Sequence, residues 1–293
     1  MCLIIFVLIV GLGSTYGSKC GDISGKWVNE LGSHMTIEHR PLNRITGEYK
    51  TAVETFKGAA ALVSNLTGTY LSVSDGALIG FSVLFNRGAS LTSWVGQCIV
   101  CDGEEKLFTT WVLRRHAETP KKWMITNVHQ NTFLRIGNDA DSSHHSSNRI
   151  SSRRPESIRA DIEDRIKGQW ISDSGDKLNI SAHSEPGLFT GTNCHSEIIG
   201  HSDGSDNFAA LGFVSPLSSK KFKVWAGHLY ESGTEKKLET SWLTHEFRKD
   251  CQNPRHLVQF GVDHYSHAGK NEGSVLKEES FLEIIKNFFR WMF

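Results

Sequence analysis

The sequence lacks an excess of charge of either sign, and this excludes one class of partner. Its 293 residues carry 32 Lys and Arg against 32 Asp and Glu. Nucleic-acid binding usually needs a basic surface, so we expect no DNA or RNA partner. Prolines are few, at 6, whereas the hydrophobic fraction of 39% is ordinary for a folded chain.

Catalytic and metal-binding signatures are also scarce. The sequence has no His-Glu-x-x-His zinc motif and no phosphate-binding loop. The paired histidines His144 and His145, and His264 with His267, lack a framework of cysteines or carboxylates at metal-ligand spacing. We therefore expect no enzyme, no metal site and no cofactor.

Long hydrophobic runs are absent after the first residues. Residues 2–13 are apolar and are followed by small residues, so residues 1–17 are predicted to be a secretory signal peptide. The run is shorter than the roughly 20 residues of a membrane span. Removal of the signal takes Cys2 and leaves an odd number of cysteines in an oxidising compartment. The glycosylation motifs at Asn65 and Asn179 agree with a secreted, extracellular glycoprotein.

What is present is a repeat. Gly25-Lys26-Trp27 is echoed by Gly168-Gln169-Trp170, and Trp94-Val95-Gly96 is echoed by Trp225-Ala226-Gly227. Further pairs keep the same order, which indicates a duplicated domain. We predict one domain at 18–137 and a second at 165–268. The Ser- and Arg-rich stretch 138–164 is predicted to be a flexible linker.

Short runs that alternate apolar and polar residues predict an all-β fold. In the first copy they lie around Trp27 and at 34–38, 45–53, 68–73, 78–85, 90–100, 106–115 and 124–136. Eight strands in up-and-down order leave two open edges unless the sheet closes. We therefore expect two eight-stranded antiparallel β-barrels in tandem, each with room for a small ligand.

The tail at 269–293 has a different pattern. Ser280 to Glu283 form a capping box, and an apolar face follows at helical spacing, made by Phe281, Leu282, Ile285, Phe288, Phe289 and Met292. We predict a short amphipathic helix that packs on protein. Contact with a membrane interface is the alternative, disfavoured because the helix carries little net positive charge.

Two families of barrel proteins begin with Gly-x-Trp, the lipocalins and the avidins. The first copy resembles the avidins over nearly its whole length, in blocks that keep their order: Cys20, residues 25–33 (GKWVNELGS), 35–37 (MTI), 47–53 (GEYKTAV), 80–81 (GF), 94–98 (WVGQC), 110–114 (TWVLR), Trp123 and Asn131. This resemblance implies a non-catalytic protein that binds biotin in its first barrel.

The resemblance also assigns roles to residues. It makes Asn29, Ser33 and Tyr49 donors to the urea oxygen of biotin, and Thr51 and Asn131 acceptors from its N–H groups. It places the other binding residues along the ring and the tail of the ligand: Phe85, Ser90, Thr92, Trp94, Trp111 and Leu113. Trp123 would cap the site of a neighbouring subunit, which implies a homo-oligomer, and Cys20 would pair with Cys98.

Some positions depart from the family pattern. Glu54 would repel the carboxylate of biotin unless Arg87 compensates, and Gly88 lacks a hydroxyl. In the second copy Ser172, Asp176, Asn193 and His195 stand at the positions of Asn29, Ser33, Tyr49 and Thr51, while Lys223, Thr244 and Arg255 replace Thr92, Leu113 and Trp123. Only Asp263, at the position of Asn131, is a functional match. We expect the second barrel to bind biotin poorly or not at all.

Two further questions stay open from the sequence. Cys194 and Cys251 form a candidate pair in the second copy, which would leave Cys101 as a buried thiol or as a crosslink between chains. Two alternative functions also remain: a barrel pair without biotin that serves as an extracellular oligomerisation module, and a lipocalin-like carrier of a small apolar ligand.

Overall fold

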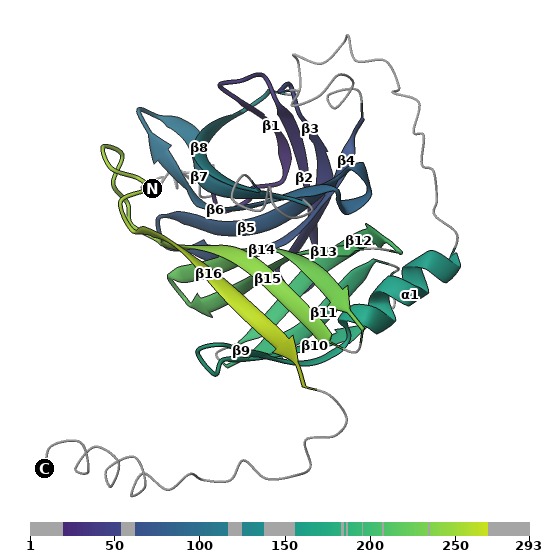
Figure 1. The fold of residues 1–293 in the computed structure, drawn as a ribbon. Coiled ribbons are helices and arrows are strands. Elements are labelled where there is room, and N and C mark those ends of the chain that lie inside the picture. The colour runs from purple at the N-terminus through teal and green to yellow at the C-terminus, as the bar shows by residue number, and fades with distance from the viewer. Residues whose placement is uncertain are drawn as a thin grey trace, which may run out of the picture.

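The structure is a computed structural model that describes residues 20–53, 62–116, 125–137, 156–182, 185, 187–194, 196–206, 208–233 and 235–268. It contains two closed antiparallel barrels of eight strands each, in up-and-down order (Figure 1). This confirms the predicted all-β tandem. The predicted signal peptide, Trp123 and the predicted tail helix lie outside the described residues.

The first barrel contains every strand that its alternating pattern predicts. Its strands are β1 (Gly25–Asn29), β2 (His34–Arg40), β3 (Arg44–Lys50), β4 (Ser64–Val73), β5 (Gly76–Phe85), β6 (Ser90–Cys101), β7 (Glu104–Arg115) and β8 (Thr126–Arg135), with the 3-10 turn η2 (Asn86–Gly88) after β5. Pairing of β1 with β8 closes the sheet and removes its two edges.

The second barrel repeats this plan. Its strands are β9 (Gly168–Ser172), β10 (Lys177–Ala182), β11 (Leu188–Asn193), β12 (Glu197–Ser205), β13 (Phe208–Ser218), β14 (Lys221–Ser232), β15 (Glu235–Glu246) and β16 (Val258–His267), and β16 pairs with β9. One helix, α1 (Glu156–Ile166), precedes β9.

Helix α1 corrects the predicted linker, since residues 156–164 were expected to be flexible. The buried side chains of Ile162 and Ile166 belong to the core of the second barrel. Arg165 donates from Nε to Glu231 Oε2 at 2.7 Å and from Nη1 to the Ser205 carbonyl at 2.8 Å. The helix therefore covers part of the second barrel, as Figure 1 also shows.

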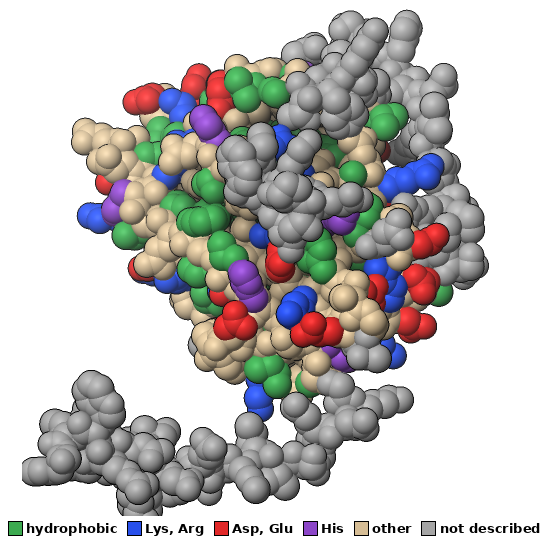
Figure 2. Space-filling model, in the orientation of Figure 1, with side chains coloured by type: hydrophobic (Ala, Val, Ile, Leu, Met, Phe, Trp, Pro, Cys, Tyr) green, Lys and Arg blue, Asp and Glu red, His purple; other side chains and the backbone are tan. Residues whose placement is uncertain are grey.

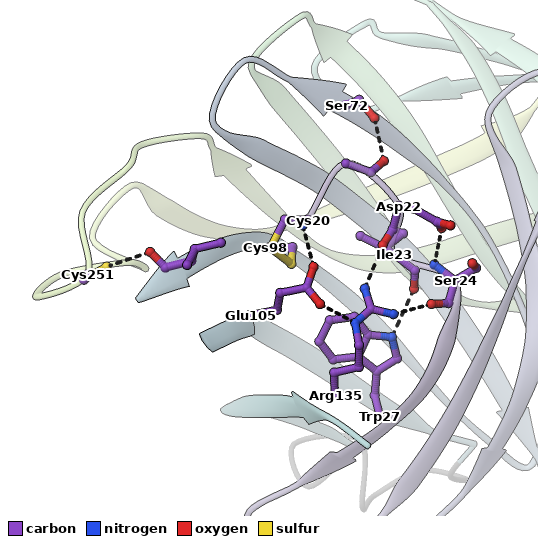
Figure 3. Close-up of a disulfide and its surroundings, with 12 residues drawn as sticks. Cys20, Asp22, Ile23, Ser24, Trp27, Ser72, Cys98, Glu105, Arg135 and Cys251 are labelled. Carbon is purple, nitrogen blue, oxygen red and sulfur yellow. Dashed lines mark hydrogen bonds and ion pairs between the residues drawn. A yellow bond between two sulfur atoms is a disulfide. The ribbon is translucent and has the colours of Figure 1, made fainter. Parts of the chain in front are cut away.

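Trp27 of β1 lies in a cluster of contacts beside the Cys20–Cys98 disulfide (Figure 3). Trp27 is fully buried and donates from Nε1 to the Ile23 carbonyl at 3.0 Å. The Arg135 guanidinium lies 4.4 Å from its ring and pairs with Glu105, whose other oxygen accepts from the Cys20 N–H. Trp170 occupies the same place in the second barrel, bonded to the Ile166 carbonyl at 2.8 Å.

The two barrels pack face to face through β4–β7 and β12–β15. Their shared core is apolar and buried: Leu78, Leu91, Val95, Val112, Ile199, Ala210, Val214, Phe222, Val224, Ala226 and Leu243. Gly80 and Gly212, equivalent residues of the two copies, allow the close approach. A Cβ on Gly80 would lie 2.4 Å from Val214 Cγ2, and one on Gly212 would lie 2.5 Å from Ser82 Cβ.

Polar contacts across the interface follow a pseudo-twofold axis. Gln97 and His228 are equivalent positions, as are Arg114 and His245, each pair 131 residues apart. His245 Nε2 lies 3.1 Å from Gln97 Oε1. At the symmetric place Arg114 is buried near His228, and donates from Nη1 to Ser241 Oγ at 3.0 Å. The chain thus contains its own pair of mutually complementary subunits.

Two disulfides are present among the described residues. Cys20–Cys98 joins the start of the first barrel to β6, as the resemblance implied. The second corrects the sequence analysis: Cys251 pairs with Cys101 of the first barrel, and Cys194 keeps an exposed free thiol. The second bond crosses between barrels, with a separation of 150 residues. In the chain-entropy model such a loop closure is worth about 5 kcal/mol.

The surface agrees with the charge balance of the sequence. On the face drawn in Figure 2, acidic and basic side chains lie interspersed among polar and apolar ones. Among the described residues, no helix is long and apolar enough to cross a membrane.

Candidate functional site

Strand register gathers the predicted site residues of the first barrel on its inner face. Trp94 pairs with Trp111 across β6 and β7, and Thr92 pairs with Leu113. Because side chains two residues apart share a face of a strand, these four side chains form one patch. Phe85 and Ser90 pair at the adjoining end of β5 and β6, and both are half-buried.

The turn between β1 and β2 fixes the orientation of the Asn29 amide. Asn29 Oδ1 accepts the N–H of Ser33 at 2.8 Å and that of Leu31 at 3.1 Å. Gly32 supports this turn with a φ of 81°, which favours glycine. Since its oxygen is already used, the group that the buried Asn29 can offer to a ligand is its NH2, a donor.

Ser33 and Tyr49 lie beside Asn29 and are also buried. Ser33 Oγ accepts the N–H of Ala52 at 3.0 Å, and a hydrogen bond joins the Ser33 and Tyr49 hydroxyls. Burial raises the pKa of Tyr49, a hydrogen bond with Ser33 lowers it, and the nearby Glu30 raises it. The net direction is upward, so the Tyr49 phenol stays protonated near neutral pH and is a donor.

The Asn131 side chain is held by its NH2 group, whereas Asn29 is held by its oxygen. Its Nδ2 donates to Glu30 Oε1 at 2.9 Å, and the neighbouring Thr132 N–H donates to Glu30 Oε2 at the same distance. The group that this buried side chain can offer is therefore Oδ1, an acceptor. Donors from Asn29 and from the Ser33–Tyr49 pair, and an acceptor from Asn131, are thus available within one barrel.

Aromatic rings form the wall between these polar groups. Trp94 stacks on Phe81 at 5.0 Å and lies 5.1 Å from Tyr49, and Trp111 stacks on His129 at 5.9 Å. Trp94 Nε1 is buried and has no hydrogen-bond partner among the described residues. A buried N–H without a partner lowers stability by about 1–3 kcal/mol unless a ligand or a water molecule accepts a hydrogen bond from it.

The remaining predicted residues lie at the rim or outside the described residues. Thr51 follows β3 and its Oγ1 donates to the Val53 carbonyl at 3.1 Å. Arg87 and Gly88 belong to η2, where both have positive φ values, and Gly88 is buried against the second barrel. Glu54 and Trp123 lie outside the part of the chain that the structure describes.

The equivalent place in the second barrel is filled by its own side chains. Lys223 Nζ lies 4.7 Å from the Trp225 ring, 4.1 Å from the Trp242 ring and 3.4 Å from Asp263 Oδ2. Asp263 also accepts from both indole N–H groups and from the Tyr265 hydroxyl. Its predicted match to Asn131 is therefore one of position only, because its acceptor capacity is already used.

The other predicted differences of the second barrel are also visible. Ser172 Oγ accepts the Asp176 N–H at 2.9 Å, and Asn193 Oδ1 accepts the Ser196 N–H at 2.8 Å. Burial lowers the pKa of Lys223, while Asp263 and Asp176 raise it. Thr244 is buried on β15, and His195 lies outside the described residues.

Two further groups of residues resemble known chemical sites. A Gly-x-Ser-x-Gly pattern at 200–204 matches the nucleophile motif of hydrolases, which sits at a turn between a strand and a helix. Here it lies inside β12, with Ser202 buried. Cys20, Cys98 and Glu105 bring three ligand atoms together, but both sulfurs are in the disulfide and offer no thiolate.

Sequence reasoning missed Glu30 and His129 as neighbours of the site, and the Lys223–Asp263 pair. Glu30 is an exposed acidic residue in a turn, which carries no signal by itself. Lys223 and Asp263 lie on β14 and β16, with β15 between them. The two side chains meet because the sheet curves into a barrel. Pairing of adjacent strands alone does not predict the contact.

Comparisons with known proteins place these features in context. The model of the avidin family matches residues 17–136. Avidin-related protein 4/5 of Gallus gallus is 36% identical over 139 residues, covering 46% of this chain and 90% of that protein. A solved structure described as a biotin binding protein from chicken is 36% identical, covers 41% of this chain and 98% of that chain, and has a TM-score of 0.38.

A much longer relative matches as well. Fibropellin-1 of Strongylocentrotus purpuratus is 39% identical over 94 residues, which are 31% of this chain and 8% of that protein. The chain therefore spans less than a tenth of the length of this relative.

Proposed function

Because the chain belongs to the avidin family, we propose that its first barrel binds biotin reversibly and without chemistry. The observation that carries the proposal is the orientation of the polar groups. Asn29 and Asn131 have opposite ends of their amides engaged, so one offers a donor and the other an acceptor. Biotin needs this combination, since its urea carbonyl accepts while its two urea N–H groups donate.

The rest of the pocket supports the same ligand. Asn29 and the Ser33–Tyr49 pair provide donors for one oxygen, which stabilises the partial charge of the urea carbonyl in a site shielded from water. Trp94, Trp111 and Phe85 suit the apolar ring and the alkyl tail. Lys223 and Asp263 support the second half of the proposal, that the second barrel takes no biotin.

Titration of the full chain with biotin tests the proposal. We expect quenching of tryptophan fluorescence, a stoichiometry of one biotin per chain, and a rise in melting temperature with excess ligand. The Tyr49→Phe variant removes one donor and should weaken binding about 10- to 100-fold. Tyr70→Phe is the control, because Tyr70 stacks on His39 instead.

The outcomes separate the main proposal from its alternative. If biotin causes no quenching and no thermal shift, the alternative function is favoured, a pair of barrels that serves as an oligomerisation module without biotin. The extensive interface between the barrels supports that alternative. Binding of two biotins per chain would contradict the proposal that the side chains of the second barrel fill its own pocket.

Secretion and assembly are proposed with the same function. Two disulfides support an oxidising compartment, and Asn65 and Asn179 are exposed, as glycan attachment requires. We propose that chains assemble further, with Trp123 capping a neighbour's site as the family resemblance implies. The paired barrels would then be the building block of the assembly.

A further inference from the structure

The loop between β15 and β16, residues 247–257, lies across the outside of the first barrel. In Figure 1 it is the yellow-green loop that rises beside that barrel. Arg248 exchanges two hydrogen bonds with Gln97 on β6, Lys249 pairs with Asp75 at 2.9 Å, and Cys251 is bonded to Cys101 at the end of β6. The loop is thus anchored at several points before it reaches β7 and β8.

Arg255 is the residue of this loop that reaches the strands of the candidate site. Its Nε donates to the Thr109 carbonyl at 3.1 Å. Its Nη2 donates to the Asn131 carbonyl at 2.6 Å and to Thr132 Oγ1 at 2.7 Å. The guanidinium carbon lies 5.0 Å from the Phe108 ring, and the side chain is half-buried.

Residues 131 and 132 are therefore held by two opposite charges. Arg255 binds the Asn131 carbonyl and the Thr132 hydroxyl, while Glu30 binds the Asn131 amide and the Thr132 N–H. Glu30 follows Asn29 directly in the turn between β1 and β2, so this network joins the donor end of the pocket to its acceptor end. The attraction of Glu30 opposes the effect of burial on the pKa of Arg255.

We propose that Arg255 of the second barrel is a positioning residue for the ligand site of the first barrel. By fixing the backbone at Asn131, it holds the Asn131 side chain in the geometry that Glu30 orients, with Oδ1 available to a ligand. The second barrel then contributes to binding although its own pocket is filled. This inference rests on the proposed function, because the ligand in question is biotin.

The test compares two variants of the same loop. Arg255→Ala removes the contacts with β7 and β8, whereas Lys249→Ala removes an exposed ion pair between the barrels and leaves those contacts intact. In the ligand-free protein, Arg255→Ala should raise amide hydrogen exchange in residues 126–135 at least tenfold, and Lys249→Ala should not. Biotin affinity should fall about tenfold in the first variant and less than twofold in the second.

A double-mutant cycle separates positioning from general support. In an Asn131→Ala background, Arg255→Ala should have no further effect on affinity, because the side chain it positions is gone. Arg255→Lys keeps the charge and a donor, so it should recover part of the affinity, and it replaces the alanine variant if that fails to fold.

Each outcome points in one direction. If the wild-type chain binds no biotin, the proposed function fails, and the exchange measurement still decides whether Arg255 orders β8. If the wild type binds and Arg255→Ala matches Lys249→Ala in affinity and exchange, the positioning role is overturned. An equal loss from Arg255→Ala with and without Asn131 would also overturn it.

Discussion

Lys223 takes the space between two tryptophan rings that a ligand of the second barrel would need. Its ammonium contacts both rings and pairs with Asp263, and both side chains are largely buried. Two opposite charges are tolerated in a largely buried environment because they form an ion pair. Losing one partner leaves the other buried without compensation, which is more costly than losing both.

We therefore predict that Lys223→Met lowers the stability of the chain by about 2 kcal/mol. The double variant Lys223→Met with Asp263→Asn should recover part of that loss, because no unpaired charge remains although the amide has one acceptor oxygen fewer for the bonds that Asp263 accepts. Thermal unfolding of the two single variants and the double variant measures the coupling. Additive losses would show that the pair contributes nothing as a pair.

At the scale of residues, the family resemblance grouped the side chains of the candidate site but could not predict how its polar groups would be oriented. Alternation in β6 and β7 places Thr92, Trp94, Trp111 and Leu113 on one face, and the register agrees. The opposite orientations of Asn29 and Asn131 depend on a turn and on Glu30. The contact of Asn131 with Glu30 joins distant segments of the chain, so no local pattern contains it.

Helix α1 illustrates a limit at the scale of elements. Isoleucines recur every four residues at 158, 162 and 166, which is a helical signal, but the surrounding charges resemble a polar linker. Strands were easier to predict because alternation persists over long runs such as β6 and β7. The helix becomes stable by packing on the second barrel, and tertiary contacts of this kind are invisible to propensity.

We predict that Ile162→Ala lowers stability by about 3 kcal/mol, because the side chain is buried in the core of the second barrel. Asp161→Ala is the matched control. Asp161 is exposed and pairs with Arg165 at 3.7 Å, which is worth about 0.5 kcal/mol or less. Differential scanning calorimetry of both variants checks the contrast, and equal shifts would show that α1 is not part of the folded core.

At the scale of the whole molecule, buried histidines make stability depend on pH. Burial lowers the pKa of His201 and of His228 to about 3 and that of His245 to about 4. Arg114 and His116 lower the pKa of His228 further, and Arg255 and His256 do so for His245. His228 and His245 also lie in the interface and bond to acceptor oxygens of the first barrel, so their protonation keeps these bonds but places a charge among buried residues.

The sign follows from proton uptake. Below the usual histidine pKa of about 6.5 the unfolded chain binds protons that the folded chain excludes, so stability falls as pH drops from about 6.5 toward 4. We predict a decline of about 1 kcal/mol per pH unit for each of these residues. Melting temperatures from pH 7.5 to 4 measure it. His228→Gln should flatten the curve, whereas exposed His264→Gln should not.

The sequence could not predict how the two barrels pack against each other, because this also depends on contacts between distant segments. Cys194 was the candidate partner of Cys251 within its own copy, yet Cys251 is bonded to Cys101 of the other. Pairing of cysteines depends on which surfaces meet. The apolar residues of those surfaces, such as Val95 and Val224, look like ordinary strand residues.

Covalent linkage of the barrels changes how their interface depends on concentration. Two separate chains would dissociate on dilution, whereas tethered partners meet at an effective concentration in the millimolar range at any dilution. The Cys101–Cys251 bond tightens this tether. Each half also has its own residue at every position of the repeat, so a substitution in one half does not recur in the other. His245 faces Gln97, whereas at the symmetric place Arg114 lies near His228, and two identical subunits could not combine these two different contacts.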